Sequence, residues 1–176
     1  MAVVPILQYP NKRLNTKAEH VDNVTEVQTI IDDMFETLHK TDNCAGLAAT
    51  QLDFKNPKRI TVIYDYRETE HPSTEQSLVL INPEVIHREG EMSQTEGCLS
   101  VGCQTWEAIK RSAKVRVSYL DRDGNPQVIE GEGFFAKLLQ HEIDHLDGYI
   151  FLDRLSRLKR QRIDKRFEKH LREQEK

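Results

Sequence analysis

Residues 140–148, which read QHEIDHLDG, carry the side chains best suited to chemistry. His141 and His145 are four residues apart, so on a helix they share one face and can hold one metal ion together. Glu142 lies at the edge of that face, where its carboxylate can reach a water molecule beside the metal. The pattern therefore predicts a hydrolytic metal site with Glu142 as general base. Two histidines on an exposed helix are the simpler alternative, but the apolar residues around them favour burial.

The third metal ligand has to come from another part of the chain, because a hydrolytic metal usually takes three protein ligands and keeps one open position. The candidates are the three cysteines, Cys44, Cys98 and Cys103. Cys98 is preferred because it lies in the segment EGCLS, whose glycine allows close approach of the backbone. The residues alone leave the choice open, since a lone buried cysteine is more often a small core residue.

Length, composition and charge predict one domain with an appendage. The 176 residues are 38% hydrophobic and 31% charged. We find neither a signal peptide nor an apolar run that could span a membrane, and the odd number of cysteines suggests no disulfide framework, so we expect a cytoplasmic protein. Residues 154–176 carry a formal charge of +6 and the remainder −10. We therefore expect a catalytic metallohydrolase domain at residues 1–153 and a basic helical extension at residues 154–176.

The periodicity of apolar residues predicts an α+β fold, in which short antiparallel strands pack around a central metal-binding helix. An N-terminal helix is expected at residues 25–40, followed by a loop at 41–51. Pro83 is expected to end one of the strands. The metal-binding helix begins near Gly133 and stops at Gly148. A basic C-terminal helix follows from about residue 156. The expected strands are 59–64, 77–82, 85–87, 97–101, 114–120 and 127–130.

Three segments together resemble the signature motifs of the peptide deformylases, of the bacterial type with a basic C-terminal helix. They are GLAATQ at residues 46–51, EGCLS at 96–100 and QHEIDH at 140–145. Their order and separations match the family, and the resemblance covers nearly the whole chain. The resemblance implies removal of the formyl group from N-formyl-methionyl nascent polypeptides, with release of formate. It also implies Cys98 as the third ligand, and one divalent metal ion per chain: Fe(II) in cells, with Zn, Ni or Co possible on isolation.

The resemblance also implies roles for other residues. Glu142 would move the proton, while the Gln51 amide and the Leu99 backbone N–H would stabilise charge on the formyl oxygen. Further residues would bind the peptide or hold the ligands in place. The peptide-binding set is Ala45, Gly46, Phe134, Lys137 and Leu138, and the ligand-supporting set is Glu96, Arg111 and Asp144.

The resemblance implies that the C-terminal helix binds the ribosome near the exit tunnel, and its basic side chains favour contact with phosphate. A helix that is merely solvated is the alternative. The protein is expected to be a monomer, with no membrane partner. The basic residues concerned are Arg157, Lys159, Arg160, Arg162, Lys165, Arg166, Lys169 and Arg172.

Four positions depart from the family pattern and suggest a divergent second deformylase. Cys44 replaces a glycine, Gly102 replaces a proline, and Thr105 stands where many members have a larger Arg or Tyr. Lys137 occupies a position that is usually apolar, near the methionine pocket. Two other functions use the same motif: a zinc peptidase, and a ribosome- or RNA-binding module with a structural metal site closed by four ligands.

Overall fold

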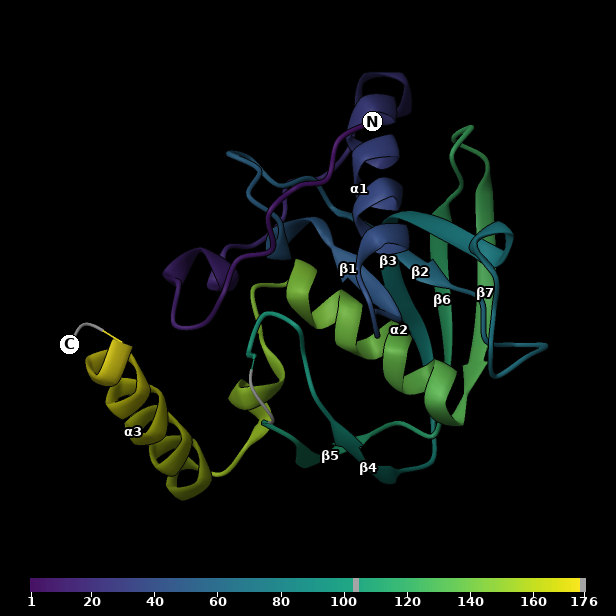
Figure 1. Ribbon diagram of the computed structural model, residues 1–176. Coiled ribbons are helices and arrows are strands. Elements are labelled where there is room, and N and C mark those ends of the chain that lie inside the picture. Colours follow the sequence, from purple (N-terminus) through teal and green to yellow (C-terminus); the bar gives the residue numbers. More distant parts are fainter. Residues whose placement is uncertain (103–104, 175–176) are drawn as a thin grey trace.

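The computed structural model describes residues 1–102 and 105–174 (Figure 1). Along these residues, one α-helix precedes all of the strands and two α-helices follow them. The helices are α1 (Gln28–Lys40), α2 (Gly133–Leu146) and α3 (Arg157–Gln174), and the strands are β1 (Gly46–Ala48), β2 (Ile60–Tyr64), β3 (Ser77–Glu89), β4 (Met92–Glu96), β5 (Glu107–Arg111), β6 (Lys114–Leu120) and β7 (Pro126–Glu132). None of the helices in these residues is long and apolar enough to cross a membrane.

All strand pairs in the two sheets are antiparallel. Five strands form one sheet in the order β1-β2-β3-β6-β7, and β4 pairs with β5 in a separate two-stranded sheet. β1 is an edge strand of the larger sheet, and it pairs with β2 through Gly46 and Ile63. The smaller sheet and α3 lie at the bottom and lower left of Figure 1. The predicted α+β fold class is therefore confirmed.

The two faces of the central strands bury different helices. Side chains alternate between the two faces along a strand, so Val62 packs in the cluster that contains α1, whereas Ile63 packs in the cluster that contains α2. Both residues are fully buried. This arrangement places α2 between the large sheet and the remainder of the chain, which explains why eleven of its fourteen residues are buried.

The prediction that Pro83 ends its strand is wrong. β3 runs through this residue to Glu89, with a shift of register between Ile81 and Glu84. A bulge is one of the few places where a strand tolerates proline. Asn82 stabilises the bulge, because its side chain accepts a hydrogen bond from Val21 N and donates one to Val21 O, both at 2.9 Å.

Several further segments differ from their predicted structure. The predicted strand at residues 97–101 is a turn, in which Val101 N donates to Cys98 O at 3.0 Å. The strands β4 and β5 were not predicted, and the expected loop at residues 41–51 contains β1 and a short 3-10 turn. α1 begins at Gln28, after a 3-10 turn in which Asn23 accepts a hydrogen bond from Thr25 N. The predicted helices are thus present, whereas β4 and β5 were missed because their polar sequences show no clear alternation of apolar and polar residues.

Gly148 ends α2, as predicted. Its φ of 85° lies in the left-handed region that glycine favours. Tyr149 N donates to Asp144 O at 2.9 Å and Gly148 N donates to His145 O at 3.1 Å. These two bonds form a Schellman motif, which satisfies the last carbonyl groups of the helix. A side chain here would also collide with Asn15 O, 2.8 Å from an added Cβ.

Helix α3 packs on the body through one face only. Ile163 is 5% exposed. The rings of Phe167 and Tyr9 meet edge to face with centroids 5.0 Å apart, and the Tyr9 hydroxyl donates to Asp164 at 2.6 Å. The two leucines of the helix, Leu158 and Leu171, are instead 59% and 40% exposed. The apolar contacts of the helix with the body therefore lie in its middle.

Candidate active site

The structure brings the three predicted metal ligands together. His141 and His145 come from α2, and Cys98 comes from the turn that follows β4. The two Nε2 atoms lie 3.2 Å apart, and Cys98 Sγ lies 3.4 Å from His145 Nε2. All three ligand atoms lie within 4.8 Å of one another, which suits a single ion with one open position.

Cys44 is not placed to join this cluster. Its Sγ donates to Gly46 O at 3.3 Å, and burial raises its pKa, so the thiol stays protonated. A protonated thiol is a poor metal ligand. Cys103, the other competing cysteine, lies outside the described residues. In the described part of the chain, Cys98 is the cysteine that converges with the two histidines.

Glu96 supports His141 from the side away from Cys98. Glu96 Oε2 lies 2.9 Å from His141 Nδ1, so the imidazole can donate there while Nε2 remains available to a metal. A carboxylate in this position fixes both the tautomer and the orientation of a ligating histidine. Burial raises the pKa of Glu96, but hydrogen bonds from Arg111 and His141 outweigh it and hold the pKa at about 2. Glu96 is therefore ionised at neutral pH.

Arg111 joins the two buried carboxylates that the sequence singled out. It donates to Glu96 through two bonds of 2.7 and 2.9 Å, and to Asp144 through one of 2.5 Å. Its side chain is only 1% exposed. Arg154, which was not predicted, donates twice to Asp144 at 2.6 Å. The charged groups thus form a chain from His141, a predicted ligand, to the segment before α3.

Glu142 has a carboxylate oxygen with no protein partner. The residue is 3% exposed, and Oε2 makes no hydrogen bond to any residue the structure describes. Burial raises the pKa of Glu142 to about 7. An added Cβ on Gly46 would lie 3.1 Å from Glu142 Oε1, so glycine at 46 leaves room for the carboxylate. A carboxylate with this pKa can both take up and release a proton near neutral pH.

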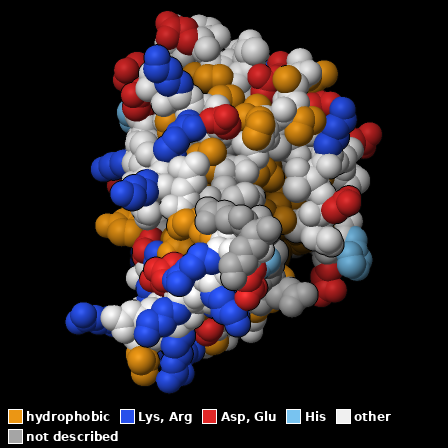
Figure 2. Space-filling view, turned by 60° about the vertical axis from the view of Figure 1, so that its left-hand side comes forward, with side chains coloured by type: hydrophobic (Ala, Val, Ile, Leu, Met, Phe, Trp, Pro, Cys, Tyr) orange, Lys and Arg blue, Asp and Glu red, His pale blue; other side chains and the backbone are white. Residues whose placement is uncertain are grey.

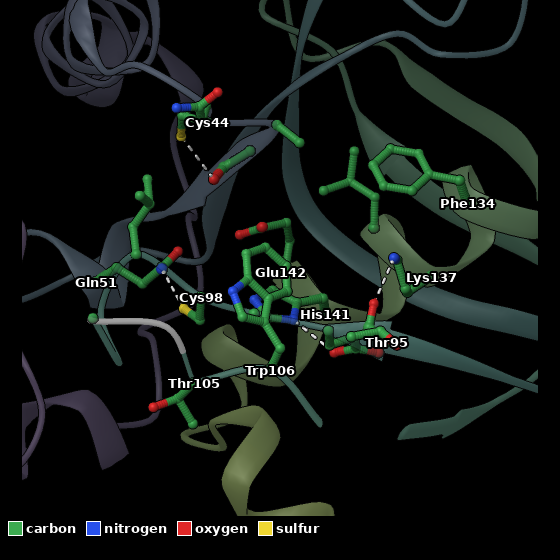
Figure 3. Close-up of a pocket in the computed structure, with 18 residues that line it drawn as sticks. Cys44, Gln51, Thr95, Cys98, Thr105, Trp106, Phe134, Lys137, His141 and Glu142 are labelled. Atoms are coloured by element: carbon green, nitrogen blue, oxygen red, sulfur yellow. Dashed lines mark hydrogen bonds and ion pairs between the residues drawn. The ribbon is translucent and has the colours of Figure 1, made fainter. Parts of the chain in front are cut away.

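Gln51 and Leu99 line the same pocket as Cys98, and Gln51 lies beside Cys98 in Figure 3. Gln51 Nε2 donates to Cys98 Sγ at 3.4 Å and to Ser100 Oγ at 3.2 Å. Gln51 Oε1 accepts from Ala48 N at 2.9 Å, which fixes the amide so that its N–H groups face Cys98. The structure thus brings a side-chain amide donor to the edge of the proposed metal site.

A pocket of about 370 Å³ opens beside these residues. It is bounded by β1 on one side and by the first turns of α2 on another, and Phe134, Lys137 and Leu138 contribute to the latter wall (Figure 3). Lys137 Nζ donates to Thr95 O at 3.1 Å and lies 4.6 Å from the centre of the Phe134 ring. The Lys137 stem therefore lies along the pocket with its ammonium group already engaged. Ala45 and Gly46 line the opposite side.

Sequence reasoning missed one large residue of the pocket, Trp106. Its ring packs over Gly97, where an added Cβ would lie 2.7 Å from two ring carbons. The only available sign was a lone tryptophan eight residues after Cys98. Thr105 and Gly102, two of the departures from the family pattern, line the same pocket. These departures thus gather at the pocket and leave the predicted metal ligands unchanged.

A cysteine sulfur and two imidazoles that converge beside a buried carboxylate and an open pocket are the arrangement expected of a metal-dependent hydrolase. The family model for polypeptide deformylase matches residues 3–161, and the chain belongs to this family. The family consists of metal-dependent enzymes that remove the N-formyl group from nascent polypeptides.

The chain is 54% identical over 165 residues to "Peptide deformylase 1" of Coxiella burnetii, covering 93% of this chain and 94% of the relative. It is 45% identical to "Peptide deformylase 2" of Vibrio parahaemolyticus over the whole of both chains.

Solved structures give the same result. A crystal structure of a peptide deformylase from Legionella pneumophila superposes with a TM-score of 0.83 at 38% identity, covering 99% of each chain. A peptide deformylase from Ehrlichia chaffeensis in complex with actinonin gives a TM-score of 0.83 at 36% identity, covering 97% of this chain and 98% of that one. The matches support the deformylase interpretation, and they lend no support to the peptidase alternative.

Proposed function

We propose that Cys98, His141 and His145 hold the metal ion of this deformylase, and that Glu142 moves the proton in the reaction. The observation that carries the proposal is the convergence of Sγ and two Nε2 atoms beside the unpartnered Glu142 carboxylate. A buried charge without a partner is unfavourable, so a cation beside these groups satisfies both features. When bound, a divalent ion supplies Lewis-acid activation of water and of the formyl carbonyl.

Glu142 acts first as base and then as acid. It accepts a proton from the attacking water and delivers it to the amine as the C–N bond breaks. The products are formate and a free N-terminal amine. Its pKa, raised to about 7 by burial, is suited to both steps, because the best catalytic pKa lies near the working pH.

The Gln51 amide and the Leu99 backbone N–H stabilise the charge that develops on the formyl oxygen. Donors that are already oriented before the reaction act most strongly in a site that excludes water. Gln51 is 2% exposed and held by Ala48 N, so little reorganisation is needed. Glu96, Arg111 and Asp144 keep His141 in its orientation.

The peptide binds along β1, whose outer edge offers backbone groups for pairing. Ala45 and Gly46 make these contacts. The first side chain, methionine, enters the wall formed by Phe134, Leu138 and the stem of Lys137, since a flexible thioether fits an irregular apolar slot. The ion in cells is Fe(II), as the family resemblance implies. Zn, Ni and Co suit the same ligands and can replace it on isolation.

Residues 1–153 form the catalytic unit and residues 154–176 the ribosome-binding extension of a monomer that works in the cytoplasm, where nascent chains emerge. Lys and Arg side chains gather on the face of α3 in Figure 2. Lys169 and Arg172 have side chains that are 78% and 74% exposed. Arg160 is only 24% exposed and pairs with Asp153 and Asp164. The outward residues Arg157, Arg162, Lys165, Lys169 and Arg172 are therefore the main phosphate contacts.

Co-sedimentation with ribosomes tests this extension. A variant in which glutamine replaces four basic residues at once, Arg157, Arg162, Lys165 and Lys169, should bind ribosomes more weakly. Its binding should also depend less on salt concentration, since each phosphate contact contributes to the salt dependence of the affinity. Lys114→Gln with Arg116→Gln on β6 is the matched control, because these side chains are about half exposed, at 50% and 49%. Unchanged co-sedimentation of the α3 variant would contradict ribosome binding through α3.

Formate release from a formyl-Met peptide under anaerobic conditions with Fe(II) tests the central reaction. The acetylated peptide should be inert, and the free-amine peptide should remain uncleaved. Peptide-bond cleavage in either control would instead favour the peptidase function.

A further inference from the structure

Trp106 is the largest exposed apolar side chain beside the proposed metal site. It is the only tryptophan in the chain and is 66% exposed. It lines the same pocket as His141 and Glu142, and it lies among the residues of that pocket in Figure 3. One edge of its ring rests on Gly97, so the ring has little freedom to fold back over the turn.

The residues on both sides of Trp106 are held by the same helix, α3. Arg166 Nη2 donates to Thr105 Oγ1 at 2.8 Å, and Thr105 is 4% exposed. Lys159 Nζ donates to Glu107 Oε2 at 3.1 Å. Because Ile163 lies between these two basic residues and is buried against the body, α3 itself is fixed where it makes these contacts.

When an apolar side chain of a ligand covers a rigidly held, exposed aromatic ring, apolar surface leaves water and the complex is stabilised. The wall at Leu138 is the proposed place for the first side chain of the peptide. Leu138 is 6% exposed there, whereas Trp106 is mostly open to solvent. Trp106 therefore lies where a peptide leaves the pocket, beyond its first residue.

We propose that Trp106 is a specificity residue that contacts the side chain of the second residue of the formyl peptide, and that α3 positions it through Arg166 and Lys159. The ligand class is a peptide with a large apolar second residue. The inference rests on the proposed function, because the pocket for the first residue fixes which residue reaches the mouth. It gives α3 a task at the active site that is independent of any ribosome.

Formate release from the peptides formyl-Met-X-Ala, with X as alanine, leucine or phenylalanine, tests the contact. The wild type should prefer leucine and phenylalanine over alanine, and Trp106→Ala should lose about two- to tenfold of that preference. The loss should appear in KM, with kcat on the alanine peptide unchanged. Trp106→Phe should restore part of it. An unchanged preference in Trp106→Ala, with normal metal content, would overturn the proposal.

The positioning role of α3 is tested by Arg166→Ala and Lys159→Ala. Each should reduce the preference for a large second residue, by less than Trp106→Ala does. Arg172→Ala is the matched control, because this arginine contacts Glu168 within the same helix and should leave the preference unchanged. If the Arg166, Lys159 and Arg172 variants behave alike, α3 does not position Trp106.

Tryptophan fluorescence gives a reading that does not depend on any variant. Since Trp106 is the only tryptophan, the emission of the wild type reports this residue alone. The product peptide Met-Leu-Ala, at a concentration that fully inhibits formate release, should shift the emission to shorter wavelength more than Met-Ala-Ala does. Identical emission with the two peptides would overturn the contact even where a variant failed to fold. If the wild type releases no formate even from the alanine peptide, the result would instead contradict the proposed function.

Discussion

The metal centre and the mouth of the pocket are built in opposite ways. Around His141, the supporting charges are buried, and Arg111 and Glu96 have side chains only 1% and 2% exposed. Around Trp106, the supporting ion pair is partly open to solvent, and the side chains of Lys159 and Glu107 are 51% and 26% exposed. The first region belongs to motifs shared with the family, whereas the second contains two of the departures from it, Gly102 and Thr105.

This difference suggests that the metal centre determines the reaction, whereas the mouth of the pocket determines substrate preference. A buried charge network loses much of its stabilising free energy when one member is removed, because the remaining charges stay buried and unpaired. An exposed ion pair contributes little, so it can change without harm to the fold. We therefore expect large effects from substitutions at the metal centre, and graded changes of substrate preference from substitutions at the pocket.

The largest effect is expected from Glu142→Gln. The amide keeps the shape of the side chain but cannot carry the proton, so kcat should fall about 10²- to 10⁴-fold. Metal content should stay at the wild-type level, because Glu142 is not assigned as a ligand. A variant that loses its metal but keeps its activity per bound ion would show that the role is misassigned.

Replacing Arg111 tests how much the metal centre depends on buried charge. Arg111→Met leaves Glu96 and Asp144 without their shared cation, and the free energy of unfolding should fall by about 3–5 kcal/mol. The control is Arg116→Met, which removes an exposed pair with Glu130 and should cost about 0–1 kcal/mol. Urea unfolding of both metal-free variants measures the contrast, and equal losses would break the comparison between buried and exposed charges.

The pH dependence of the metal-free protein should reveal the burial of Glu142. Burial raises its folded pKa from 4.5 to about 7, so the folded state binds more protons than the unfolded state between these values. The free energy of unfolding should therefore fall as pH rises from about 4.5 to 7, by about 3 kcal/mol. Glu142→Gln should remove this part of the pH dependence, as followed by urea unfolding at several pH values. A variant with the same pH profile as the wild type would contradict the shift.

The smallest effect is expected at Lys137, within the pocket. Lys137→Ile removes the ammonium group that donates to Thr95 O, and leaves a shorter apolar side chain on the same wall. Large apolar first residues should then react about two- to tenfold better relative to methionine, the range that one methylene group in a pocket can produce. Norleucine and methionine should be accepted almost equally by the wild type. A strong wild-type preference for methionine over norleucine would argue against this wall as the first-residue pocket.

The sequence predicts the metal centre better than the pocket, and the reason lies in the spacing of residues. His141 and His145 are four apart on one helix, so local geometry alone brings them together. The three ligand-supporting residues, Glu96, Arg111 and Asp144, are far apart in the chain. The motifs indicated which residues they are, but not which of them contact one another. Their order in space, and the contribution of Arg154, depend on the packing of β4, β5 and α2.

The fold shows the same limit. Apolar periodicity predicted the helices, and Gly148 ended α2 as its position suggested. β4 and β5 were missed because residues such as Ser93 and Lys110 are polar and show no clean alternation. Pro83 misled the prediction because a bulge accommodates it. Trp106 was missed because its position depends on contacts from α3, about fifty to sixty residues further along the chain.

Metal content per chain in Cys98→Ser and Cys44→Ser tests the central claim most directly. A serine hydroxyl ionises far less readily than a thiol, so Cys98→Ser should lose most of its metal during dialysis against a mild chelator. Cys44→Ser should keep about one ion per chain, as the wild type does, because its Sγ contacts a backbone carbonyl. Retention of metal by Cys98→Ser, or equal loss from both variants, would contradict the assignment of Cys98, His141 and His145 as the metal site.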